Sequence, residues 1–225
     1  MADGTVRMEG VDFFMSEITK DSTMSVRRAI IRKIACTAVM TALAVTLMYV
    51  EVSLPFMPPF LKFDFSEIPV LVGSFALGPI YGIIIELLKN LLHLPATGTM
   101  GIGELSNFIT GSIYVFTAGM IYSKHRTRKG AIISMIVATL LLGLIACPFN
   151  YFITLPLYES VLHVPMEAIL GMCSYNPLIK EKIDLITYVF LPFNLFKGTV
   201  VAIITFFIYK PISRLINKTY KETRE

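Results

Sequence analysis

Long apolar runs separated by short polar or proline- and glycine-rich segments dominate this chain. Runs of about 20 apolar residues cross the hydrocarbon core of a bilayer as helices, and shorter ones do so when they are partly buried by neighbours. We therefore predict an all-α integral membrane bundle of about six transmembrane helices. The expected helices cover residues 34–50, 68–77, 80–94, 104–123, 131–157 and 183–209.

The segments between these runs are predicted to be loops. Residues 51–65 contain Pro55, Pro58 and Pro59, which exclude a regular helix there. Residues 95–103 are rich in Gly and Thr, and residues 158–182 are polar, with room for a short surface helix. We divide the chain into a flexible cytoplasmic tail (1–25), a six-helix membrane domain (26–212) and a cytoplasmic C-terminal tail (213–225).

Basic residues are concentrated in three segments, and this pattern sets the expected orientation. Lys and Arg gather in short segments on the cytoplasmic side of membranes. With six spans the three segments fall on one face, so both termini are expected in the cytoplasm and the three loops above outside. The basic residues are Arg7, Lys20, Arg27, Arg28, Arg32 and Lys33; then Lys124, Arg126, Arg128 and Lys129; then Lys210, Arg214, Lys218, Lys221 and Arg224.

Composition agrees with a membrane protein and leaves no room for a further soluble domain. The 225 residues are 55% hydrophobic and 16% charged, whereas soluble domains are roughly 45–50% apolar and about 25% charged. The net charge of +4 is explained by topology and does not indicate nucleic-acid binding. Cys36, Cys147 and Cys173 have no metal-site spacing and are interpreted as structural.

Motifs for covalent chemistry are missing from the sequence. Residues 73–78 have the glycine spacing of a phosphate-binding loop, but Pro79 stands where that loop needs Lys. The histidines, His93, His125 and His163, are scattered and form no catalytic or metal-binding pattern. We therefore expect no enzyme, no metal site and no cofactor.

Ionisable residues inside the predicted spans mark candidate functional positions, because such groups are costly in lipid. Glu86 and Lys89 are three residues apart and are expected to pair near the outer surface. Lys197 has Asn194 on the same helix face and no acid at helical spacing, and Asn150 lies in a Tyr- and Phe-rich helix end. An ammonium and amides without an acid suit a neutral ligand rich in carbonyls and ring nitrogens.

A small-residue motif lies on the first predicted span. Ala38 and Ala42 are four residues apart, a spacing that lets another helix approach closely. The spacing fits either an internal contact or a docking face for a partner.

Several motifs together resemble the S components of energy-coupling-factor (ECF) vitamin transporters, and within them the riboflavin binders. The resemblance covers about residues 27–212, with a segment between Tyr158 and Asp184 that is longer than usual. The motifs are PPFLKFDFSEIP (58–69), FALGPIYG (75–82), KNLL (89–92), NYFITLPLY (150–158) and PFNLFKG (192–198).

This resemblance implies a six-helix bundle that binds one vitamin near the extracellular face of a bacterial cell membrane. It implies a lid in the loop after the first helix, which holds Leu61, Phe63 and Asp64 and contributes backbone or apolar contacts. It also implies that Asn150, Asn194 and Lys197 hold the flavin ring.

The family further implies that the S component lacks ATPase activity and works with partner proteins. These are a transmembrane T component and two cytosolic ATPases, with Ala38 and Ala42 forming the docking face for the T component. Riboflavin is then a transported ligand and not a cofactor.

Other interpretations stay open at this point. The same architecture carries other vitamins, such as thiamine, folate or biotin; a cationic vitamin would call for a deep carboxylate, for which Glu86 is the one candidate. A small membrane enzyme or a subunit that binds no ligand are the remaining alternatives.

Overall fold

The computed structural model describes residues 4–55 and 57–221, with the side chains of residues 4–23, 25 and 213–221 outside the description. Part of the first and last basic segments therefore lies outside the described side chains.

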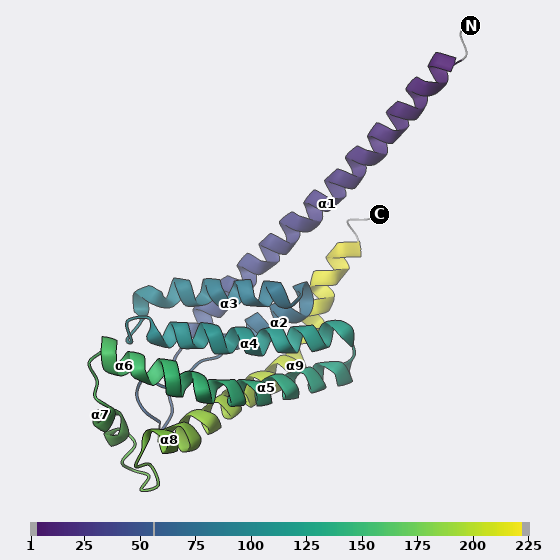
Figure 1. Ribbon diagram of the computed structural model, residues 1–225. Helices are drawn as coiled ribbons and strands as arrows, with labels where there is room; N and C mark the ends of the chain where they lie inside the picture. The colour runs from purple at the N-terminus through teal and green to yellow at the C-terminus, as the bar shows by residue number, and fades with distance from the viewer. Residues whose placement is uncertain (1–3, 56, 222–225) are drawn as a thin grey trace.

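Helices dominate the described chain (Figure 1). In order, the elements are α1 (Gly4–Met48), β1 (Val52–Ser53), β2 (Lys62–Phe63), α2 (Glu67–Leu77), α3 (Pro79–His93), η1 (Leu94–Ala96), α4 (Ile102–Lys124), α5 (Arg128–Phe149), η2 (Asn150–Thr154), α6 (Leu155–Val161), α7 (Met166–Gly171), α8 (Lys182–Leu185), η3 (Ile186–Phe190) and α9 (Leu191–Lys221).

Helix α1 is longer than the sequence analysis predicted. Its apolar part ends at Met48, close to the predicted end, but the helix already begins at Gly4. Residues 4–25, which we assigned to a loose tail, continue this helix and project away from the bundle (Figure 1). Helix α9 likewise runs on to Lys221, into the predicted C-terminal tail. Neither extension needs an apolar face, since each lies beyond the packed helices, so hydrophobic periodicity could not reveal it.

The loop after α1 contains a short β-hairpin that the sequence analysis missed. Strands β1 and β2 pair in antiparallel fashion, with Val52 opposite Phe63 and Ser53 opposite Lys62. Two-residue strands leave almost no alternation to recognise. The hairpin closes the segment that leads into α2, which we call the lid (residues 51–65).

A tight turn joins α2 and α3, as the Gly78-Pro79 pair predicted. Gly78 has φ of 114°, a backbone conformation that favours glycine. Pro79 is the first residue of α3, where its missing N–H costs nothing. The turn lets both helices lie against α1 and α4.

Two helices contain π-helical turns, η2 between α5 and α6 and η3 between α8 and α9. Pro148 lies just before η2, inside α5. A proline removes one backbone hydrogen bond and pushes against the preceding turn, which gives a physical reason for the wider turn that follows. Such π-turns widen the helix and frequently occur at functional sites. η2 and η3 contact each other, so the two irregular turns lie at one end of the bundle.

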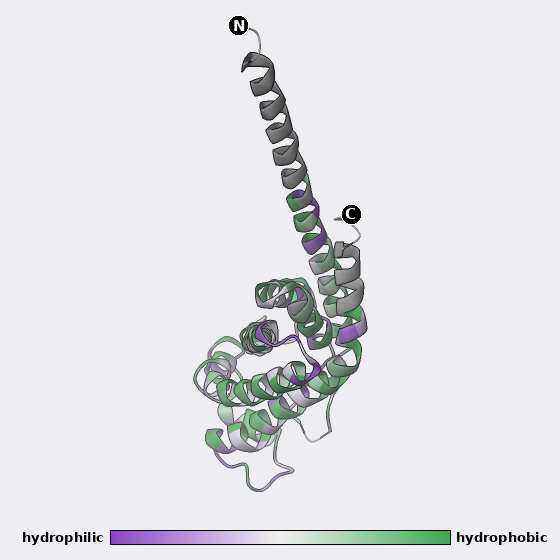
Figure 2. Ribbon diagram, turned by 90° about the vertical axis from the view of Figure 1, so that its right-hand side faces the viewer, coloured by the Kyte–Doolittle hydropathy of each residue, from purple (hydrophilic) through white to green (hydrophobic). Residues whose placement is uncertain are grey.

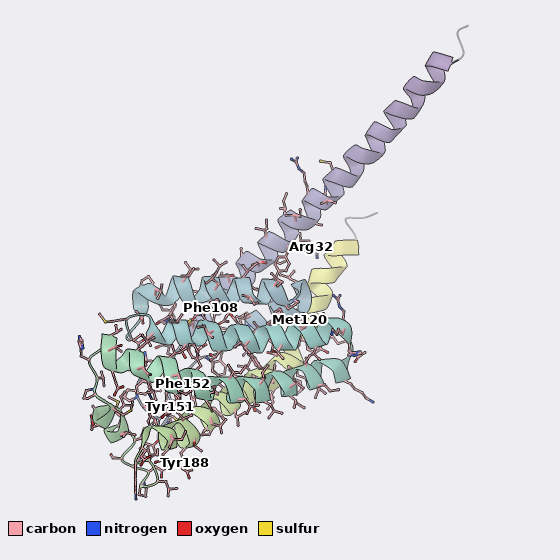
Figure 3. All side chains as sticks on the ribbon, in the orientation of Figure 1. Arg32, Phe108, Met120, Tyr151, Phe152 and Tyr188 are labelled. Atoms are coloured by element: carbon pink, nitrogen blue, oxygen red, sulfur yellow. The ribbon has the colours of Figure 1, made fainter. Side chains whose placement is uncertain are left out.

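The two ends of the bundle differ in chemistry. Both chain termini leave at one end, and α6, α7 and the lid lie at the other (Figure 1). Figure 3 shows Arg32 toward the first end and Tyr151 and Tyr188 toward the second. One apolar core, which includes Leu71, Tyr114 and Val201, unites α1 to α5 with α9. A second core gathers α6, α7, η3 and the lid.

Apolar residues cover the helices of the bundle, and hydrophilic ones mark the base of the α1 projection and the loops (Figure 2). Within the described residues, three helical stretches are long and apolar enough to cross a membrane: 26–48, 128–161 and 182–212. Many of their large apolar side chains are exposed, including Ile34, Leu144 and Phe207. A surface of this kind requires an apolar solvent, so the chain is a membrane protein.

Candidate ligand-binding site

A cavity of about 420 Å³ lies between the lid and the helices α2, α4, α5 and α9. That volume suits a small organic ligand. Three predicted site residues, Asn150, Asn194 and Lys197, line it together with Leu61 and Asp64 of the lid. The structure thus brings together side chains from three separate segments of the chain: the lid, η2 and α9.

Asn150 and Asn194 are oriented in the same way. Asn150 Nδ2 donates to the Ala146 carbonyl at 2.7 Å, and Asn194 Nδ2 donates to the Phe190 carbonyl at 2.8 Å. Each bond anchors the amide to its own helix, beside a π-helical turn. An amide offers two N–H donors and an acceptor oxygen, so each Asn keeps donor and acceptor capacity for a ligand.

Lys197 is held by two partners from other elements. Its Nζ donates to Asp64 Oδ2 at 3.0 Å and to Asn107 Oδ1 at 3.2 Å. An ammonium has three N–H donors, so two bonds leave one donor for the cavity. The expectation of a lysine without an acid nearby is therefore wrong. Asp64 lies 133 positions away in sequence, and spacing along α9 could not reveal it.

The three lid residues that the resemblance implied differ in their relation to the cavity. The carboxylate of Asp64 accepts from Lys197 Nζ and from the Ser66 N–H, the latter at 2.8 Å. Phe63 does not line the cavity; its ring packs on Phe65 and Phe196, with ring centroids 5.0 and 5.6 Å away.

An aromatic wall, formed by Phe60, Tyr158 and Phe190, lines the same cavity as these polar groups. Phe60 of the lid contacts Tyr158 at 5.0 Å and Phe190 at 6.2 Å between ring centroids. All three residues line the cavity. Flat rings of this kind cover the face of an aromatic ligand.

A second buried ionic cluster adjoins the cavity. Lys89 Nζ contacts Glu67 Oε1 at 2.5 Å, Glu86 Oε2 at 2.9 Å and Ser66 Oγ at 2.9 Å. Lys89 and Glu86 pair with each other, as their spacing predicted, and both side chains are fully buried within the protein. The sequence analysis did not single out Glu67, which is the first residue of α2 and lies 22 positions before Lys89. Glu86 is therefore not the one deep carboxylate.

A third polar group ties the lid to the body of the protein. His93 Nδ1 lies 2.9 Å from Glu104 Oε1, and His93 Nε2 lies 3.5 Å from Glu51 Oε1. Glu51 also pairs with Lys62 across the hairpin, and Glu104 accepts from Thr97 at 2.7 Å. These groups lie beside the cavity mouth, which Glu51, Lys62 and Glu104 line.

The proposed docking residues face outward. Ala38 and Ala42 are both exposed on α1, while Thr37, Met40 and Thr41 of the same helix are buried. The exposed face is therefore open to lipid or to another protein. An internal contact, the other reading of the motif, is not what the structure shows for these two residues.

Comparison with known proteins finds a matching family and a similar solved structure. The family model described as the ECF transporter, substrate-specific component matches residues 32–209. The chain belongs to this family. It is similar to a solved structure titled "Structure and mechanism of the S component of a bacterial ECF transporter", with a TM-score of 0.65 and 30% identity, covering 82% of this chain and 96% of that one.

Two relatives of this S component are both named riboflavin transporters. It is 30% identical to the riboflavin transporter RibU of Staphylococcus aureus, over 83% of this chain and 93% of the relative. It is 28% identical to the riboflavin transporter FmnP of Bacillus subtilis, over 80% and 90%. The S component is thus part of a transporter and not an enzyme, which confirms that expectation.

Proposed function

We propose that this S component binds riboflavin from outside a bacterial cell and delivers it to an ATP-driven membrane complex. The observation that carries the proposal is the cavity, which Asn150, Asn194 and Lys197 line together with the aromatic wall. The relatives named as riboflavin transporters support the choice of vitamin.

The cavity matches the chemistry of riboflavin, which is a flat, neutral ring system with a polyol chain. The amides of Asn150 and Asn194 pair with the N3–H and carbonyl edge of the ring, and the third donor of Lys197 reaches a carbonyl or ring nitrogen. Phe60, Tyr158 and Phe190 cover the apolar end. An analogue without that polar edge would leave the site's own groups unpaired and would be rejected.

The acid beside Lys197 does not favour a cationic vitamin such as thiamine, because Asp64 is already paired with that lysine. A carboxylate neutralised by a lysine attracts a cation less than a free one does. The pairing therefore supports a neutral ligand next to Lys197, although the sequence argument for it was incomplete.

We place six helices across the plasma membrane, with both termini in the cytoplasm. The described basic side chains Arg27, Arg28 and Lys33 are exposed, as are the four in the α4–α5 loop. That loop and both termini lie at one end of the bundle (Figure 1). The arrangement agrees with the positive-inside rule. Residues 26–212 then form the substrate-binding membrane domain, between tails 1–25 and 213–225.

For transport, the S component works with a transmembrane T component and two ATPases. Ala38 and Ala42 supply the docking face, because their small side chains let a partner helix approach closely. Ala38→Trp is expected to abolish uptake and leave riboflavin affinity unchanged. Leu43→Trp, on another exposed face of α1, is the control and should retain uptake. Normal uptake by Ala38→Trp would contradict the docking face.

The first experiment is an absorption and fluorescence spectrum of the protein purified in detergent. A flavin band in the blue, with fluorescence that appears only on denaturation, is the expected result. Titration of the emptied protein with riboflavin should quench flavin fluorescence to a one-to-one endpoint. A colourless protein that also fails to quench riboflavin would exclude this vitamin, and thiamine, biotin and folate would be tested next.

A further inference from the structure

Among the described carboxylates that pair with a lysine, Glu67 is the one that both lines the cavity and has an oxygen without a hydrogen-bond partner. It stands in the first turn of α2, lines the cavity and is only 3% exposed. Its Oε1 is bound by Lys89 at 2.5 Å. Its Oε2 has no hydrogen-bond partner among the described residues. A buried carboxylate oxygen without a donor is unfavourable by about 1–3 kcal/mol or more.

The buried ionic groups of Asp64, Glu67, Glu86, Lys89 and Lys197 include one carboxylate in excess. Asp64, Glu67 and Glu86 carry three carboxyl groups, while Lys89 and Lys197 carry two ammonium groups. Lys197 belongs to Asp64, so Glu67 and Glu86 share Lys89. Of these two, only Glu67 lines the cavity. A ligand with hydrogen-bond donors would satisfy Glu67 from the cavity side.

The wall beside Glu67 is shaped for this carboxylate. A methyl group added at Gly111 of α4 would lie 3.0 Å from Glu67 Oε1 and 2.5 Å from Glu86 Oε1. Gly111 also lines the cavity, together with Thr110 and Tyr114. The glycine thus lets α4 pass close to the two acids while the cavity remains open beside Glu67.

We propose that Glu67 is a ligand-binding residue, whose free carboxylate oxygen accepts a hydrogen bond from a donor of the transported molecule. This inference rests on the proposed function, in which that molecule is riboflavin. Riboflavin offers two kinds of donor, the hydroxyls of its polyol chain and the N3–H of its ring. Lys89 acts as a positioning residue, because it holds Oε1 and so orients Oε2.

The matched pair of variants is Glu67→Gln and Glu86→Gln. Each removes one carboxylate from Lys89, but only Glu67 lines the cavity. Three ligands serve as probes: riboflavin, lumiflavin (which has a methyl group in place of the polyol) and 3-methylriboflavin (which lacks the N3–H). The measured quantity is the Kd for each, from flavin fluorescence quenching, expressed as the ratio of variant to wild type.

For Glu67→Gln and riboflavin we expect a ratio of roughly ten, because hydrogen bonds to a charged acceptor are about twice as strong as neutral ones. The ratio should fall toward one for the ligand that lacks the relevant donor. A fall with lumiflavin identifies a hydroxyl as that donor, and a fall with 3-methylriboflavin identifies the ring N–H. Glu86→Gln should give ratios near one for all three ligands.

The proposal is overturned if Glu67→Gln gives the same ratio with all three ligands, or a ratio within twofold of one for riboflavin. Binding stoichiometry reports the folded fraction, so partial misfolding does not change the Kd. If Glu67→Gln does not fold, Glu67→Asp takes its place; it keeps a charge for Lys89 and draws the carboxylate back from the ligand. Wild-type protein that binds no flavin would instead refute the proposed function itself, before any variant is measured.

Discussion

Two buried lysines, Lys89 and Lys197, have similar exposure and different surroundings. Lys89 is 0% exposed, donates hydrogen bonds to Ser66 and Glu67, forms an ion pair with Glu86, and does not line the cavity. Lys197 is 8% exposed, donates to Asp64 and Asn107, and lines the cavity. Burial of a charge therefore does not by itself mark a ligand site. What distinguishes Lys197 is its position on the wall of the cavity.

The comparison also explains why the two lysines should fail differently when replaced. Removing Lys89 leaves the carboxylates of Glu67 and Glu86 buried without a counter-charge. Removing one partner of a buried ion pair in this way is strongly destabilising. Removing Lys197 leaves Asp64 beside the cavity, where it keeps its bond from the Ser66 N–H. We expect the first change to act mainly on folding and the second mainly on binding.

Lys89→Met should have the largest effect, a loss of about 3–5 kcal/mol in the free energy of unfolding. Thermal unfolding of the detergent-solubilised protein measures it, and little folded protein is expected at the temperature where wild type is intact. The triple change Lys89→Met, Glu67→Gln, Glu86→Gln should recover much of the stability, since it removes the unpaired charges. A stable Lys89→Met that loses only riboflavin binding would erase the contrast between the two lysines.

Lys197→Met should keep most of the stability and lose affinity for riboflavin. The expected loss is about 1.5–3 kcal/mol of binding free energy, because hydrogen bonds to charged groups contribute about that much. Titration by fluorescence quenching measures it, with Lys180→Met as a control, since Lys180 is exposed and does not line the cavity. Unchanged affinity would show that Lys197 only neutralises Asp64.

The helices and loops were predictable because their signals are local. Proline and glycine mark the lid and the Gly78-Pro79 turn, and apolar runs mark α2, α3 and α4 to within two residues. Asn150, Asn194 and Lys197 also stood out, because polar groups within apolar runs are costly and few. Each of these signals lies within one segment of the chain.

The ionic partners could not be predicted, because they depend on which helices lie side by side. Lys89 is three residues from Glu86, a pair that helical spacing does reveal, but its closer partner Glu67 comes from α2. Asp64 reaches Lys197 from the lid. No periodicity relates such positions, and acids near a helix start are usually explained by the helix dipole.

Gly111→Ala tests the contact between the Lys89 cluster and the cavity and should have the smallest effect. The added methyl group would meet Glu86 Oε1 at 2.5 Å and force the carboxylate to shift, at a cost of about 1–3 kcal/mol. Alanine recovers up to about 1 kcal/mol in helix propensity, so a net loss of roughly 1 kcal/mol is expected.

Gly171→Ala is the matched control, because nothing lies within 4 Å of its added methyl group, and it should leave the unfolding temperature unchanged or slightly raised. If Gly111→Ala lowers stability with less than a twofold change in riboflavin affinity, the carboxylates of Glu67 and Glu86 shift without changing the shape of the cavity. If it weakens riboflavin binding tenfold while stability holds, the shift of the acids on Lys89 reaches the binding site through Glu67. Lys89 would then matter for binding as much as for folding.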